Sequence, residues 1–262
     1  MRRSVSLAAT VLAAVSMSAC SDSASGPSGG GQVNFNLATR PLATAGATAL
    51  ATVGSPETFS DGTNTLIIDQ VQLVLREIEL KRVEATAACG EVSDDDCEKL
   101  ELGPILLDLP LGVGGAARSF SVAVDTGTFR EIEFEIHKPS DDDAADVAFR
   151  QAHPDFAGTS VKVTGSFNGV PFSYSSGLDA EEEIELSPPL VVSAAASADL
   201  TLMVDLDRWF RDASGGLVDP ASALAGGANE GLVETNIRTT LHAFEDEDHD
   251  GTDDHGSHSS DD

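Results

Sequence analysis

The chain has 262 residues, and 15 lysines and arginines stand against 44 aspartates and glutamates, which gives a formal net charge of −29 at pH 7. This charge argues against nucleic acid as a partner, because phosphate binding requires positive charge, and it favours divalent cations as ligands. Hydrophobic residues make up 41% of the chain, enough for the core of one all-β domain or of two small ones.

Residues 1–19 predict a signal peptide for export. Arg2 and Arg3 give the start a positive charge, and the apolar run from Val5 to Val15 is too short to cross a bilayer as a mature helix. Further on, Met17 to Cys20 resemble a bacterial lipobox. We therefore expect cleavage before Cys20 and attachment of diacylglycerol to its sulfur. The alternative is an ordinary secretory signal with a cysteine at its cleavage site.

Residues 20–32 predict a flexible tether rich in glycine and serine, because they contain little that a core could bury. The lipid makes the membrane a partner of the protein and predicts a location in the cell envelope. Ser21, directly after the modified cysteine, resembles the residue that sorts lipoproteins to the outer membrane in some bacteria. We expect the protein on the periplasmic or the surface side of that membrane.

Residues 33–244 predict one β-sandwich domain. Val33, Phe35 and Leu37 alternate with polar or small residues, as in a half-buried strand. The segment from Thr65 to Val83 changes the face of its apolar residues midway, which a strand achieves through a β-bulge. An amphipathic helix is the alternative there, but the β-branched residues and the apolar run 105–109 favour a hairpin.

Two cysteines lie in the connection between the two arms of this hairpin. Cys89 and Cys97 enclose a short acidic loop, and in an oxidising compartment they predict a disulfide that contributes roughly 2.5 kcal/mol. The alternative is a metal-binding or redox pair, which is disfavoured because the segment has neither a C-x-x-C motif nor a histidine. We interpret the pair as a staple at the tip of the hairpin.

Residues 119–124 and 128–137 alternate apolar and polar positions on either side of a turn. In the second of these strands, one face is predicted to join the core and the other to be acidic and in contact with water. The core face carries Ile132, Phe134 and Ile136, and the wet face carries Glu131, Glu133, Glu135 and His137.

The dipeptide Asn168-Gly169 lies between two alternating runs and predicts a hairpin, because both turn positions favour positive φ angles. Two further strands are predicted at 183–186 and 200–206, with Pro188 and Pro189 as a break between them. This succession of short strands and turns predicts an all-β sandwich with Greek-key connections.

Three segments of the chain resemble a known family. They are the strand Val71 to Leu80, the motif Leu106 to Leu109, and the segment Thr126 to Ile132. In this order they are similar to a family of bacterial lipoprotein domains known as domain of unknown function 4382, over roughly residues 33 to 163. The resemblance implies an immunoglobulin-like or prealbumin-like sandwich at the cell surface, and it carries over no catalytic residues.

The C-terminal part predicts an aromatic plug and a helix. Trp209, the only tryptophan, is predicted to close one end of the core, and the alternative is an exposed platform for sugar stacking. Asp219-Pro220 predicts a capped helical turn. A longer amphipathic helix, with Asn229 as its possible cap, is predicted from the spacing of Val233, Ile237, Leu241 and Phe244.

Residues 245–262 predict an acidic, disordered tail that contains part of a calcium motif. Acids occupy positions one, three, five and nine of an EF-hand-like loop, with Gly251 at position six, so Ca²⁺ is the candidate cofactor. Position twelve, normally a glutamate, is Ser257, which excludes a complete EF-hand. The candidate ligands are Asp246, Asp248, Asp250 and Asp254.

Histidines allow a second metal hypothesis for the same tail. Neutral imidazoles beside carboxylates can chelate Zn²⁺, Cu²⁺ or Ni²⁺ without a fixed fold. The histidines concerned are His242, His249, His255 and His258.

The common enzyme signatures are missing from the sequence, among them the G-x-S-x-G elbow, the H-E-x-x-H motif and a Gly-rich phosphate loop. We therefore predict a non-catalytic, lipid-anchored envelope protein that acts by binding or structural display, with divalent cations, an envelope protein or a glycan as ligand. The alternatives are a calcium- or carbohydrate-binding surface module and a hydrolase of unknown substrate. Several acids or a histidine converging in a deep pocket would favour the hydrolase.

Overall fold

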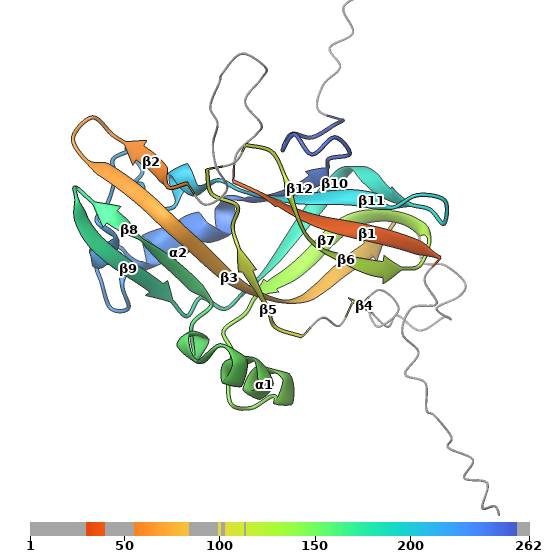
Figure 1. Ribbon diagram of the computed structural model, residues 1–262, viewed down its shortest axis with the longest axis horizontal. Helices are drawn as coiled ribbons and strands as arrows, with labels where there is room; N and C mark the ends of the chain where they lie inside the picture. Colours follow the sequence, from red (N-terminus) through yellow and green to blue (C-terminus); the bar gives the residue numbers. More distant parts are fainter. Residues whose placement is uncertain (1–29, 40–54, 84–98, 101–102, 113, 256–262) are drawn as a thin grey trace, which may run out of the picture.

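The computed structural model describes residues 30–39, 55–83, 99–100, 103–112 and 114–255. Within them the predicted all-β sandwich is confirmed: a four-stranded and an eight-stranded sheet enclose one hydrophobic core (Figure 1). The predicted lipidation site Cys20, the disulfide pair Cys89 and Cys97, and residues 256–262 of the tail lie outside the described residues.

The four-stranded sheet joins segments from both ends of the chain. Its order is β12-β11-β1-β6, and β1 runs parallel to β11, so the start of the domain lies beside its end. The strands are β1 (Gly31–Ala38), β6 (Ala117–Val124), β11 (Ala198–Val204) and β12 (Leu241–Glu245).

The eight-stranded sheet is built around the long strand β3. Its order is β10-β7-β3-β8-β9, with β2, β4 and β5 also paired to β3. Its strands are β2 (Glu57–Ser60), β3 (Thr65–Arg82), β4 (Lys99–Leu100), β5 (Ile105–Asp108), β7 (Gly127–Ile136), β8 (Val161–Phe167), β9 (Val170–Ser176) and β10 (Ala180–Val192).

The strand β3 contains the predicted bulge. The register with β7 shifts between Arg76 and Glu79, and Glu77 adopts a positive φ of 52°. Leu73 and Leu75 are therefore buried before the shift, and Ile78 and Leu80 after it. The bulge lets one strand keep its apolar residues on the core side along its whole length.

Both predicted hairpin pairings are present. β3 pairs antiparallel with β5, with Leu73 opposite Leu107. β8 and β9 are joined at Asn168 and Gly169, whose φ angles are 51° and 79°. The predicted break at the two prolines is wrong, since β10 continues through Pro188 and Pro189. The prolines fall where the register against β7 shifts, between Glu185 and Leu190, so no ladder hydrogen bond is demanded of them.

The predicted aromatic plug is confirmed. Trp209 is fully buried and follows the short helix η4 (Leu206–Arg208), and its indole N–H donates to the hydroxyl of Thr240 over 2.9 Å. The predicted turn is η5 (Pro220–Ala223), where the Asp219 carboxylate accepts from the N–H of Ala221.

The predicted C-terminal helix is shorter than expected. Helix α2 spans Glu230–Thr239, and its cap residue Asn229 makes no side-chain capping bond. Leu241 and Phe244 belong instead to β12, which pairs with β11. The helical spacing of these residues is real, but pairing with a strand distant in sequence overrides it.

Helix α1 (Ala144–Ala152) was not predicted. Asp143 caps it by accepting from the N–H groups of Ala145 and Asp146. Phe149 packs with Phe156 of η3 (Pro154–Phe156) against Val74 of β3, so the helix covers part of the outer face of the sheet. Within the described part of the chain, the helices are too short and too polar to cross a bilayer.

Candidate functional site

The loop that follows β12 brings three of the four predicted calcium ligands together. One carboxylate oxygen from each of Asp246, Asp248 and Asp250 lies within 4.8 Å of the others. Asp246 is fully buried, Asp250 is half-buried and Asp248 is exposed. The cluster is therefore closed to solvent at Asp246 and open to solvent at Asp248.

Hydrogen bonds to Asp246 hold this loop in shape. Its Oδ1 accepts from the N–H of Asp250 over 3.0 Å, and its Oδ2 accepts from the N–H of Gly251 over 3.1 Å. The hydroxyl of Thr201 on β11 also donates to Oδ2 over 3.0 Å, which ties the loop to the sheet. Gly251 has a φ of 78°, which accounts for glycine at position six of the motif.

Segment 246–255 is therefore not a free tail, contrary to the predicted disorder. The N–H of Asp246 donates to the carbonyl of Asp199, and the carbonyl of His249 accepts from the N–H of Ala116. Composition suggested disorder because the segment is acidic. The buried Asp246 and these backbone bonds give it fixed partners instead.

The fourth predicted ligand, Asp254, points elsewhere. Its Oδ2 accepts from the N–H of Glu247 over 2.5 Å, and it is not part of the cluster of three. Asp254 as a calcium ligand therefore stays a prediction, and in this structure its carboxylate accepts from the backbone instead. Ser257 and His258 lie outside the described residues.

The tail histidines do not assemble into a chelating group among the residues described. His249 Nε2 lies 3.7 Å from Asp199, and His255 Nδ1 lies 3.8 Å from Glu245. His242 is exposed on β12. No metal-sized cluster within the described ranges includes any of the three.

Negative charge is crowded around the calcium-like loop. Burial raises the pKa of Asp246, and the charge of Asp250 adds to the effect, although hydrogen bonds from Thr201 and Gly251 oppose it. Burial likewise raises the pKa of Glu245, and nearby acids of the loop add to it. A bound cation would offset both the burial of these carboxylates and their repulsion by neighbouring acids.

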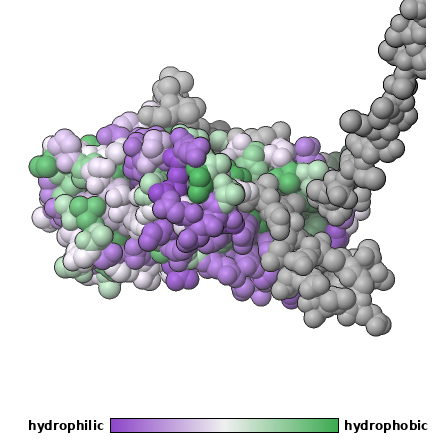
Figure 2. Space-filling model, turned by 90° about the horizontal axis from the view of Figure 1, so that it is seen from below, coloured by the Kyte–Doolittle hydropathy of each residue, from purple (hydrophilic) through white to green (hydrophobic). Residues whose placement is uncertain are grey.

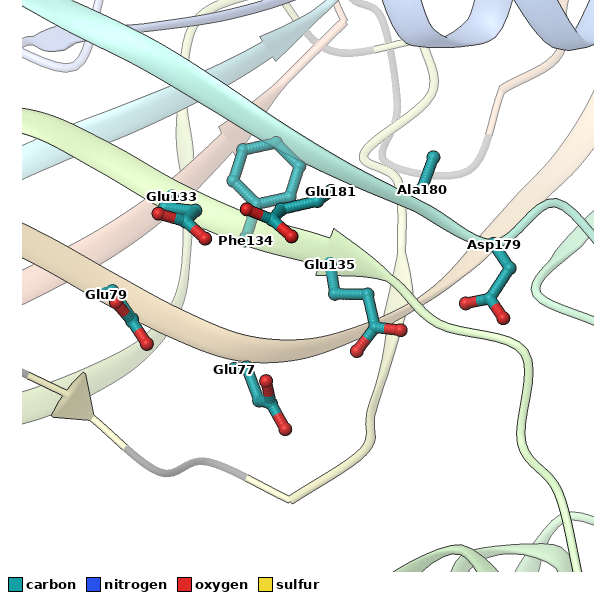
Figure 3. Close-up of a pocket in the computed structure, with 8 residues that line it drawn as sticks. All are labelled: Glu77, Glu79, Glu133, Phe134, Glu135, Asp179, Ala180 and Glu181. Atoms are coloured by element: carbon teal, nitrogen blue, oxygen red, sulfur yellow. The ribbon is translucent and has the colours of Figure 1, made fainter. Parts of the chain in front are cut away.

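A second group of acids, which sequence reasoning did not identify, lines a hollow on the outer face of the large sheet. The hollow has a volume of about 310 Å³. Figure 3 shows its carboxylates on the same side of the sheet, and Figure 2 shows hydrophilic residues gathered on the face seen from below, where Figure 1 places α1. The acids lining this acidic hollow are Glu77, Glu79, Glu133, Glu135, Asp179 and Glu181.

Register explains why these acids meet. Glu135 of β7 is opposite Arg76 of β3 on one side and Glu181 of β10 on the other. On the neighbouring rung, Glu133 is opposite Glu79. Like charges directly opposite one another destabilise a sheet, so such an arrangement needs cations or protons between the strands.

Lys81 supplies one such cation at the edge of the hollow. Its ammonium lies 2.7 Å from Glu131, 2.5 Å from Glu133 and 3.4 Å from Glu183. Hydrogen bonds to Glu131 and Glu133 raise the pKa of Lys81. The cluster of Glu131, Glu133 and Glu183 is therefore already occupied by an ammonium.

His137, predicted on a wet strand face, is buried beside Glu135 of the hollow, with 6% of its surface exposed. It does lie on the acidic face of β7, but α1 covers it. Its Nε2 lies 2.8 and 2.9 Å from the two oxygens of the fully buried Asp146 in the first turn of α1. The prediction failed because α1 was not predicted. The Asp143 cap before an alanine-rich run was the available signal.

Two carboxylates near His137, those of Glu135 and Glu181, have raised pKa values. Burial raises the pKa of Glu135, and a side-chain hydrogen bond with Asp179 raises it further, while His137 opposes the shift. A side-chain hydrogen bond with Glu133 raises the pKa of Glu181. Carboxylates at hydrogen-bond distance must share a proton or a cation. The hollow can therefore bind cations or take up protons.

Comparison with models of protein families, with curated proteins and with solved structures finds no match to this chain. The resemblance to the lipoprotein domain family therefore stays a prediction.

Proposed function

We propose that this chain is a lipid-anchored, non-catalytic domain of the bacterial cell envelope that binds Ca²⁺ at the loop Asp246–Thr252. The observation that carries the calcium part is the convergence of Asp246, Asp248 and Asp250 within 4.8 Å, in a loop already held closed by hydrogen bonds. A preformed loop lowers the ordering cost of binding.

The ligand set suits Ca²⁺ because it consists of oxygen atoms only. Ca²⁺ takes six to eight oxygens, and waters complete an incomplete protein set. The spacing of the motif adds the carbonyl of Thr252, at position seven, as a further ligand. With Asp254 turned away, we expect an affinity in the range of extracellular modules, about 10⁻⁴–10⁻³ M.

The anchoring part rests on the sequence at Cys20. Ten residues, 21–30, separate this cysteine from the start of β1 at Gly31. Fully extended, such a tether spans at most about 35 Å. The domain would therefore remain close to the membrane. The calcium loop belongs to the same sheet as β1, since the N–H of Asp246 donates to the carbonyl of Asp199, which pairs with Asn34.

Calcium titration of the mature protein tests the binding. We expect the melting temperature to rise with Ca²⁺, with a gain of about 2.7 kcal/mol in the free energy of unfolding at a hundredfold excess over the dissociation constant. Asp248→Asn removes one charged ligand and should abolish the rise. Because this side chain is exposed, the substitution should leave the fold intact. Glu247→Gln, an exposed neighbour outside the cluster, is the matched control. A calcium response equal in both variants would refute the site.

Membrane fractionation tests the anchor. The intact mass of the membrane-extracted protein should show acyl chains on a chain that starts at Cys20, and Cys20→Ser should move the protein to the soluble fraction. An unmodified thiol at this position in membrane-derived protein would contradict the proposal.

The carbohydrate alternative loses its main feature, because Trp209 is fully buried and offers no stacking surface. A second hollow, of about 520 Å³, lies between β3 and the segment after β5, but its lining includes no aromatic side chain. Stacking against a sugar ring needs an aromatic side chain. We therefore favour a cation over a glycan as the ligand.

A hydrolase remains the second candidate, because His137 converges with Glu135 and Asp179, two acids that line the hollow. Three of the six lining acids, Glu77, Asp179 and Glu181, are exposed, so the hollow is open rather than deep. A panel of ester, phosphoester and glycoside substrates separates the candidates. Turnover that disappears in Glu135→Gln would establish the hydrolase, and no turnover in any class leaves binding as the function.

A further inference from the structure

We propose that Glu135, His137 and Asp179 form a second metal site, distinct from the calcium loop, which takes a divalent transition metal such as Zn²⁺ through the imidazole Nδ1 and the two carboxylates. One ligand atom from each residue lies within 4.8 Å of the others. The three residues come from the end of β7, the position just after it, and the position just before β10.

The contact with Asp146 fixes the orientation of the His137 ring. Asp146 is fully buried, and its Oδ2 already accepts from the N–H of Ser140 over 2.7 Å, while Arg76 lies 3.5 Å from its Oδ1. With these donors on its other side, Asp146 presents acceptor oxygens to the ring. Nε2 of His137 therefore carries the proton that it donates to Asp146.

In a neutral imidazole this assignment leaves Nδ1 unprotonated, with a lone pair that can bind a cation. Nδ1 lies 3.1 Å from Oε1 of Glu135, which is also an acceptor when ionised. Asp179 contributes another carboxylate at the same point. Each of the three groups can offer an electron pair at this point, and a divalent cation between them, like a shared proton, would relieve their repulsion.

The contact between Asp146 and His137 resembles the carboxylate–histidine pair that supports metal-ligating histidines. In such sites the imidazole binds metal through one nitrogen and donates from the other to a carboxylate, which fixes the ring and raises its basicity. Here the supporting carboxylate is itself held by Ser140 and Arg76. This support comes from outside the three ligands, and it leaves Nδ1 of a buried ring facing Glu135.

The ligand set selects the class of metal. Ca²⁺ and Mg²⁺ prefer oxygen ligands only, whereas an imidazole with carboxylates suits Zn²⁺ and its neighbours. Two carboxylates also balance the charge of a divalent ion. Since Asp179 is exposed, the ion can enter from solvent, and a water molecule can occupy the remaining position.

Zinc titration calorimetry of the full mature chain tests the site, with Ca²⁺ in excess so that the tail loop is occupied. We expect one class of Zn²⁺ sites to disappear in Asp179→Asn. Glu181→Gln removes one exposed carboxylate from the same hollow but is outside the trio, so it should bind Zn²⁺ as the unmodified chain does. Both substitutions are at exposed side chains, and equal melting temperatures would show that both variants are folded.

Cobalt absorption gives a second readout, because Co²⁺ bound by an imidazole has a visible spectrum that depends on its ligands. The spectrum should change in His137→Gln, and Asp146→Asn should weaken binding about 10–100-fold through loss of the supporting carboxylate. Zn²⁺ binding by Asp179→Asn with unchanged stoichiometry and affinity would overturn the proposal. Equal losses in Asp179→Asn and Glu181→Gln would also overturn it, since they would indicate general attraction to acidic surface.

Discussion

Single hydrogen bonds at buried residues decide how firmly the C-terminal half is fixed. The hydroxyl of Thr240 accepts from the indole of Trp209 and donates to the carbonyl of Asn236 over 2.7 Å, at the end of α2. All of this lies inside the core, since Trp209 is 0% and Thr240 is 2% exposed. One hydroxyl therefore joins the aromatic plug to the helix.

Thr240→Val keeps the shape of this side chain but removes its hydroxyl. We expect a loss of about 1–3 kcal/mol in the free energy of unfolding, because a buried indole N–H is left without an acceptor. Urea unfolding followed by tryptophan fluorescence measures the loss. Thr239→Val, at the exposed neighbour, should change stability by less than about 0.5 kcal/mol. Similar losses in the two variants would contradict the role of Thr240.

Asp61 supports a loop in a way that depends on pH. Backbone hydrogen bonds from Asn64, Leu217 and Thr63 hold the pKa of Asp61 well below its usual range. A lowered pKa in the folded state stabilises the protein above the unfolded value, near pH 4, and the contribution is lost as the pH falls through the folded value.

Asp61→Asn should therefore lower the melting temperature at pH 7, and the gap to the unmodified chain should narrow as the pH is lowered toward 2. Thermal scans across this range measure the gap. Asp125→Asn, at an exposed turn residue, is the control and should show no such narrowing. A gap that stays constant with pH would show that the charge of Asp61 is not what stabilises the loop.

At the scale of elements, β3 and β8 meet so closely that one position tolerates only glycine. Their register shifts between Ile68 and Gln70, and a Cβ added to Gly165 would lie 1.9 Å from the carbonyl oxygen of Ile67. The obstacle is backbone, so a side chain cannot move aside to relieve it.

Gly165→Ala should therefore destabilise the protein by about 1–3 kcal/mol, the usual cost of overpacking. Chemical denaturation measures the effect. Ser166→Ala, at the adjacent and half-buried position of the same strand, should have a smaller effect. If the glycine variant proved as stable as the unmodified chain, the close approach of β3 and β8 would be wrong.

Elements also show where sequence patterns reach their limit. The alternation in β7 correctly separated the core residues Ile132, Phe134 and Ile136 from the acidic face. The same alternation placed His137 in water, and only the docking of α1 buries it. A strand pattern reports which face a side chain occupies, but not what later covers that face.

For the whole molecule, the dominant feature is charge. With a formal net charge of −29, the compact state suffers from self-repulsion that salt screens. The Debye length falls from about 30 Å at 0.01 M salt to about 8 Å at 0.15 M. In the presence of a calcium chelator, we expect the melting temperature to rise by about 2–4 °C over this range, which corresponds to about 1 kcal/mol.

Sodium chloride and choline chloride should act alike at equal ionic strength, because screening does not depend on the cation. Differential scanning calorimetry checks both series. A melting temperature that is flat or falling with salt would show that local ion pairs, such as that of Lys81, outweigh the net charge.

The sequence by itself determined the strand-rich fold, most strand positions, the bulge in β3 and the hairpin at Asn168-Gly169, because alternation and turn chemistry are local properties of the chain. It also identified Asp246, Asp248 and Asp250, since their spacing in one loop carries the signal. Only the tertiary structure decided that Leu241 and Phe244 join a strand and that Asp254 turns away.

The acidic hollow likewise depended on tertiary structure. Its acids come from three strands, and Asp179 reaches Glu135 and His137 only through the pairing of β10 with β7. In a chain with 44 acids, the sequence contains no signal for which of them will meet. Contacts between distant segments are fixed by packing and register, which no local pattern encodes.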